Sequence, residues 1–131
     1  MTDEPVWVSP AAAYALHDDQ IAQFGGLHGV LDRNVVESAL AKPRNLYAYG
    51  DPDIADLAAS YFCGLVQKQG FADGNKRTGL AVTLAFLRAS GWQLCADARE
   101  LFAFTYVVAR NELDEAAVAR WFRSNISPVE G

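Results

Sequence analysis

One polar stretch, QGFADGNKRT at residues 69–78, separates two long apolar runs of the chain. The run before it, residues 54–66, is rich in Ala, Leu and aromatic side chains, and the run after it, residues 79–87, is almost wholly apolar. Because the apolar residues of each run fall on more than one side of a helix, we expect two buried helices. The sequence therefore predicts an all-α fold, a compact bundle of about six or seven helices, in which the polar stretch joins the two central ones.

The polar stretch carries residue types that suit a phosphate group with a bound divalent metal. Asp73 offers a hard oxygen ligand for Mg²⁺, and Gly74 lets the backbone approach a phosphate closely. Asn75 can donate a hydrogen bond to a phosphate oxygen, while Lys76 and Arg77 supply positive charge. The helix that begins here adds its free N–H groups. The alternative is that Asp-Gly forms an ordinary turn and the Lys-Arg pair is simply solvated.

Composition indicates a single globular domain covering residues 1–131, with 51% hydrophobic and 21% charged residues. The net charge of −5 argues against a nucleic-acid partner, because duplex binding usually requires a basic surface. Cys63 and Cys95 both follow or precede apolar residues, have no zinc spacing, and are predicted to be buried reduced thiols. The N-terminus lacks a secretory pattern and no run of about 18 apolar residues occurs, so we expect a cytoplasmic protein without a membrane partner.

Helix boundaries follow from local signals on either side of the central pair. Ser9-Pro10 predicts a helix start, and Gly25-Gly26 predicts its end. Asp32 predicts an N-cap for a second helix, which we expect Pro43 to end. Residues 45–52 then form an irregular connection, interpreted either as a substrate-facing segment or as a loop whose tyrosines pack on the core.

The remaining elements are predicted in the same way. The central helices are expected over residues 53–69 and 76–90. Residues 92–95 are expected to be extended, Asp97 and Asp114 to cap two further helices, and the tail from residue 127 to fray. Two interpretations of His17 remain open: a functional histidine, or one at the surface or at the end of the core.

The run GFADGNKRTG at residues 70–79 resembles the signature of the Fic/Doc superfamily in its death-on-curing (Doc) form. That signature reads His-x-Phe-x-Asp-(Ala/Gly)-Asn-Lys-Arg, whereas the Fic form has glycine at the position of Lys76. The resemblance continues outside the motif at Leu16-His17-Asp18, Gly25-Gly26, Leu31-Asp32, Glu37-Ser38-Ala39-Leu40, Tyr49-Gly50, Phe86-Leu87 and Gly91.

This resemblance implies a small helical toxin that is encoded beside an antitoxin. Fic-type members transfer a nucleotide monophosphate from ATP to a protein hydroxyl. Doc-type members transfer the γ-phosphate to a translation elongation factor, and Lys76 favours this second reaction. The resemblance implies ATP and Mg²⁺ as cofactors, Asp73 as the metal ligand, and Gly74, Asn75, Lys76 and Arg77 as the nucleotide-binding residues, with Asp73, Lys76 and Arg77 also catalytic.

The chain departs from the signature at its first position, where Gln69 stands in place of the catalytic histidine. A carboxamide cannot act as a general base near neutral pH, and loss of such a base typically costs about 10²–10⁴-fold in rate. Three explanations stay open: an introduced disabling substitution, a natural variant that only binds, or a different base, for which His17 and His28 are the other histidines. The alternative functions are therefore a non-catalytic nucleotide- or antitoxin-binding module and a Fic-like adenylyltransferase.

Overall fold

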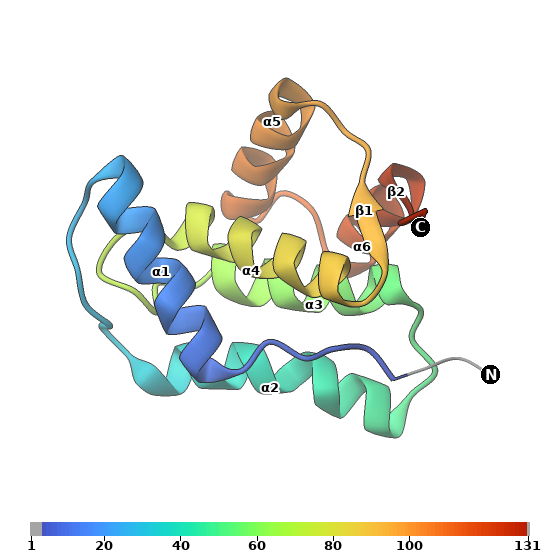
Figure 1. Ribbon diagram of the computed structural model, residues 1–131, viewed down its shortest axis with the longest axis horizontal. Coiled ribbons are helices and arrows are strands. Elements are labelled where there is room, and N and C mark those ends of the chain that lie inside the picture. Colours follow the sequence, from blue (N-terminus) through green and yellow to red (C-terminus); the bar gives the residue numbers. More distant parts are fainter. Residues whose placement is uncertain (1–3, 131) are drawn as a thin grey trace.

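The protein is described here by a computed structural model of residues 4–130. Within that range it contains six α-helices and one antiparallel pair of short strands (Figure 1). The all-α fold class expected from the sequence is confirmed. The elements in chain order are α1 (Pro10–Phe24), α2 (Arg33–Tyr49), α3 (Ile54–Val66), α4 (Asn75–Ala89), β1 (Trp92–Leu94), α5 (Ala98–Ala109), α6 (Glu115–Asn125) and β2 (Ile126–Pro128).

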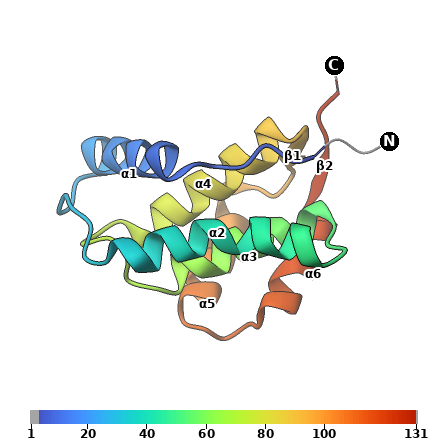
Figure 2. The same ribbon diagram turned by 90° about the horizontal axis from the view of Figure 1, so that it is seen from below.

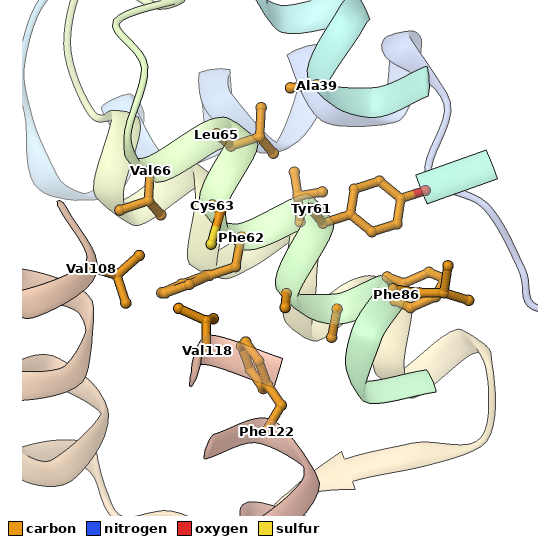
Figure 3. Close-up of a cluster of buried hydrophobic side chains, with 14 of the residues drawn as sticks. Ala39, Tyr61, Phe62, Cys63, Leu65, Val66, Phe86, Val108, Val118 and Phe122 are labelled. Carbon is orange, nitrogen blue, oxygen red and sulfur yellow. The ribbon is translucent and has the colours of Figure 1, made fainter. Parts of the chain in front are cut away.

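Helix α3 lies at the centre of the bundle, as its apolar sequence predicts. It contacts α2, α4, α5 and α6, and 10 of its 13 residues are buried. Its aromatic side chains anchor the core shown in Figure 3: Phe62 lies between α5 and α6, with its ring centroid 5.6 Å from that of Phe104 and 5.5 Å from that of Phe122. On another side Tyr61 contacts Phe86 of α4. The chain before and after the polar stretch therefore belongs to one continuous core.

Helix starts were predictable wherever a single side chain caps the first turn. Five of the six helices begin after a Ser or Asp whose side-chain oxygen accepts a backbone N–H of the first turn. These capping residues are Ser9, Asp32, Asp53, Asp97 and Asp114. Asp53 also accepts two hydrogen bonds from Arg123, which holds its pKa at about 2 and ties α6 to the start of α3.

Helix α2 is longer than predicted, because Pro43 does not end it. The helix continues to Tyr49, so the expected irregular connection over residues 45–52 is reduced to the few residues before Asp53. The physical reason is packing: the buried residues of α2 are Val36, Ala39, Leu40 and Pro43, which fall on one helical face. Burial of that face compensates for the N–H that proline lacks.

Two further sequence expectations are wrong. The C-terminal tail does not fray at residue 127, because β2 pairs with β1 in the register Trp92↔Pro128 and Leu94↔Ile126. Cys95 is exposed rather than buried, whereas Cys63 is buried as expected and burial raises its pKa to about 12. Both thiols are free.

The connection between α1 and α2 and the connection between α3 and α4 lie at the same end of the molecule (Figures 1 and 2). The N-terminal segment, β1 and β2 lie at the opposite end. The two connections are paired through an isolated antiparallel bridge between Val30 and Phe71. None of the helices in residues 4–130 combines the length and the apolar character needed to span a membrane.

The crossing of α2 and α3 generates a stability prediction at Gly64. A Cβ atom there would lie 2.9 Å from Ala39 Cβ and 3.4 Å from Ala39 Cα, so the two helix backbones would have to separate. Although alanine favours an isolated helix by about 1 kcal/mol, we expect Gly64→Ala to lower the free energy of unfolding by about 1–3 kcal/mol through overpacking. Urea unfolding measures it, with exposed Asn45→Ala as a control that should change stability by less than about 0.5 kcal/mol. A variant as stable as the parent protein contradicts the close crossing.

Candidate functional site

The polar connection between α3 and α4 is held in place by its own backbone and by Asn75. The side chain of Phe71 is buried in the core. Its backbone N–H donates to Asn75 Oδ1 at 3.0 Å, and its backbone carbonyl accepts from Asn75 Nδ2 at 3.0 Å. Asn75 thus uses its side-chain oxygen and one amide N–H in hydrogen bonds within the loop. The second amide N–H is left for the phosphate contact expected from the sequence.

The segment between α1 and α2 lies along this loop. The backbone carbonyl of Gly70 accepts the N–H groups of Leu31 and Asp32 at 2.9 and 3.1 Å, and Ala72 N–H donates to the Gly29 carbonyl at 3.0 Å. Gly70 is needed for close packing, because a Cβ atom there would lie 2.6 Å from Val36 Cγ2. The loop is therefore fixed against two other parts of the chain.

Helix α4 begins differently from the other five helices in the described chain. Its N-cap residue is Gly74, with φ of 75°, and no side chain caps its first turn. The left-handed backbone at this position favours glycine. Because no side chain accepts a hydrogen bond from the first turn, this turn offers its N–H groups and the positive end of the helix dipole to an anion.

The Asp73 carboxylate lies beside this helix start. Its Oδ2 accepts the backbone N–H of Leu27 at 3.2 Å, and its Oδ1 accepts the N–H of Gly74 at 2.9 Å. These two backbone hydrogen bonds hold the pKa of Asp73 below its usual value, and the bond from Leu27 has the larger effect. The nearby charge of Arg77 lowers the pKa further. The carboxylate is therefore ionised at neutral pH and able to serve as an oxygen ligand.

The three charged residues expected in the site do not all converge. Arg77 lies on the same side as Asp73, where its Nη2 donates to the Gly25 carbonyl at 3.1 Å. Lys76 is exposed and reaches toward α5, with Nζ 5.5 Å from the centroid of the Tyr106 ring. The structure thus brings Asp73 and Arg77 together on the α1 side of the helix start and places Lys76 on the α5 side.

Gln69, the position expected to be catalytic, is exposed within the connection between α3 and α4. The two histidines lie elsewhere. His17 is not at the surface: it is buried in the middle of α1, and its Nε2 is bonded to the Asp73 carbonyl, so the ring is not accessible to a target hydroxyl. His28 is exposed in the connection after α1.

Two cavities lie away from the start of α4. A cleft of about 1200 Å³ opens beside the start of α3 and is lined by residues that include Tyr47, Asp53 and Trp92. A smaller pocket of about 350 Å³ lies between α2 and α3. Neither is lined by Asp73, Lys76 or Arg77. Lys76 in the first turn of α4 is exposed, so this turn lies at the surface of the protein.

A model of the Fic/DOC family matches residues 7–87, which include α1 to α3, the loop and most of α4. The chain belongs to the Fic/DOC family. It is 34% identical over 117 residues to the protein kinase doc of Escherichia phage P1, a match that covers 88% of this chain and 92% of that protein. It is also 37% identical over 78 residues to toxin Doc of Mycolicibacterium smegmatis, covering 56% of this chain and 58% of that protein. The match to the phage protein extends well beyond the motif.

The contribution of α1 and of the connection after it to this candidate site was not predicted from the sequence. The contacts of His17 and Leu27 with Asp73 join residues 56 and 46 positions apart, which no local pattern reveals. One signal was present for His17: the buried residues of α1 are Ala13, His17 and Ile21, four residues apart on one face. That spacing places the histidine on the buried face of the helix.

Asn75 provides the test of how the loop is held. We expect Asn75→Ala to lower the free energy of unfolding by about 1–3 kcal/mol, because the buried backbone groups of Phe71 lose both partners. Denaturant unfolding measures the change. Gln23→Ala removes an exposed amide from α1 and serves as the matched control, with an expected effect below about 0.5 kcal/mol. Equal effects of the two substitutions would show that the Asn75 contacts do not hold the loop.

Proposed function

We propose that this protein is a Doc-type toxin whose scaffold transfers the γ-phosphate of ATP to a hydroxyl of a translation elongation factor, at a rate limited by Gln69. The observation that carries the proposal is the start of α4, which has a left-handed glycine where the other five helices have a Ser or Asp cap. Family membership and the similarity to a protein kinase support it.

Groups that can bind a polyphosphate lie on two sides of the start of α4. The first-turn N–H groups of α4 lie in the middle, with Arg77 on the α1 side and Lys76 on the α5 side. A chain of several phosphates extends far enough to meet groups on both sides, so the divergence of the two cations suits a nucleoside triphosphate better than a single phosphate. Lys76 also stands where the Fic form has glycine, which supports phosphoryl transfer over adenylylation.

The residues present fit a magnesium ion held mainly by the nucleotide. Asp73 supplies one ionised carboxylate, and residues 4–130 contain no cluster of three or more His, Cys, Asp or Glu side chains able to enclose a metal. Mg²⁺ characteristically uses one or two carboxylates and completes its shell with phosphate oxygens and water. When bound, the ion would neutralise phosphate charge during transfer. The role of this chain is to present the Asp73 oxygen beside the α4 N–H groups.

Gln69 sets the rate in this proposal. Its carboxamide can hydrogen-bond a target hydroxyl but cannot remove its proton. Because phosphoryl transfer depends chiefly on positioning and on electrostatic stabilisation, the remaining groups support a slow reaction. His17 offers no replacement base, since its ring is buried and its Nε2 donates to the Asp73 carbonyl.

An antitoxin partner is proposed from the apolar surface next to the site. Phe24, Leu27 and Leu31 are 63%, 69% and 66% exposed, and all lie in or beside the segment that pairs with the motif loop. Large apolar side chains gathered at one place on a surface commonly mark a protein interface. An antitoxin that covers them would also restrict access to the start of α4.

Restoring the base tests the transfer reaction. We expect Gln69→His to raise the transfer of label from γ-labelled ATP to elongation factor by about 10²–10⁴-fold. Gln69→Asn, which adds no base, should leave the rate unchanged, and Asp73→Asn in the Gln69→His background should abolish the gain. Transfer from α-labelled ATP instead would indicate the adenylyltransferase alternative. A Gln69→His protein that binds MgATP but labels nothing contradicts the proposed kinase activity.

A further inference from the structure

His17 makes two contacts with the motif loop from the middle of α1. Only 2% of its surface is exposed, and its ring is stacked on the Phe71 ring with centroids 4.0 Å apart and planes 12° apart. Its Nε2 lies 2.8 Å from the backbone oxygen of Asp73. A buried polar side chain in contact with two residues of the motif has a more specific role than filling the core.

The chemistry of the hydrogen bond fixes its direction. A backbone carbonyl is an acceptor, so Nε2 of His17 carries the proton and donates it to Asp73. The other ring nitrogen, Nδ1, lies 4.0 Å from the carboxylate of the exposed Asp18, which is beyond hydrogen-bond distance. The Asp73 carbonyl is thus the acceptor that determines how this ring is oriented.

The backbone and the side chain of Asp73 are both held by α1 and the residues after it. His17 fixes its backbone carbonyl, and Leu27 N–H fixes its carboxylate. Gly26 closes the third side, because a Cβ atom there would lie 2.7 Å from Asp73 Oδ2. Gly74, the N-cap residue of α4, follows Asp73 directly. Any rotation of the Asp73 peptide would therefore also displace the helix start.

We propose that His17 is a positioning residue that fixes the Asp73 backbone and thereby aims the Asp73 carboxylate at the start of α4. The effect on metal-nucleotide binding rests on the proposed function. The effect on the geometry of Asp73 does not. The donated hydrogen bond carries the positioning role, and the stacked ring contributes to stability through packing with Phe71.

Two substitutions separate these contributions. His17→Phe keeps an aromatic ring against Phe71 but has no donor, whereas His17→Gln keeps an N–H at a similar distance from the backbone but loses the ring. His17→Leu, which is smaller than phenylalanine, is a second variant without a donor. Thermal unfolding of all three reports the packing contribution independently.

The first measurement needs no nucleotide. The Leu27 amide is bonded to Asp73 Oδ2, so its exchange rate and chemical shift in NMR spectra report the direction of the carboxylate. We expect exchange at Leu27 to accelerate by up to about tenfold in His17→Phe and His17→Leu, and to stay near the parental rate in His17→Gln. An unchanged Leu27 amide in both donorless variants overturns the proposal.

The second measurement is calorimetric titration of ATP with and without Mg²⁺, well below each melting temperature. We expect His17→Phe and His17→Leu to weaken MgATP binding by about tenfold and to change metal-free ATP binding little, while His17→Gln stays close to the parent despite a lower melting temperature. Affinity that follows melting temperature across the variants would mean a purely structural role and overturn the proposal. If the parent protein binds no MgATP, the proposed function fails, and the Leu27 amide alone decides the role of His17.

Discussion

The pair of hydrogen bonds between the Asn75 side chain and the Phe71 backbone is the constraint on which the site depends. Buried backbone N–H and carbonyl groups must find partners, and a loop between two central helices has no neighbouring strand to supply a full set. Asn75 satisfies both groups of one residue from the first position of α4. Burial of the Phe71 side chain then fixes the loop to the core, so that the loop and the helix start are held by the same contacts.

This constraint frees the start of α4 from its usual cap. A Ser or Asp at the N-cap would satisfy a first-turn N–H internally, as it does in the other helices of the described chain. With Asn75 directed backward to Phe71 and glycine at the cap, the first turn stays open to a ligand. The connection after α1 then supplies what the loop lacks: it orients Asp73 through Leu27 and holds Arg77 through Gly25.

Local signals in the sequence predicted the structural features that depend on neighbouring residues. They failed for features that are determined by contacts between distant parts of the chain. The caps at Ser9, Asp97 and Asp114 were predicted because each acts within its own first turn. The prediction that Pro43 ends α2 was wrong, because the burial of Pro43 against the core cannot be read from its neighbours in the sequence. The pairing of β2 with β1 was missed for the same reason.

The candidate site shows the same division. The polar stretch was selected by its residue types between two apolar runs and by its resemblance to a family signature, and Asp73 and Arg77 both contact the connection after α1. The divergence of Lys76 toward Tyr106 and the contact of His17 with Asp73 arise from how α5 and α1 pack against the loop. No pattern within the motif contains that information.

The most direct test of this account is an NMR titration of the ¹⁵N-labelled protein with MgATP. The account predicts that the largest shifts occur at the backbone amides of Asn75, Lys76 and Arg77, with a smaller change at Leu27, and that they require Mg²⁺. Shifts confined to the cleft beside the start of α3, or no shifts at millimolar MgATP, would contradict the claim that the uncapped start of α4 binds a metal-bound polyphosphate.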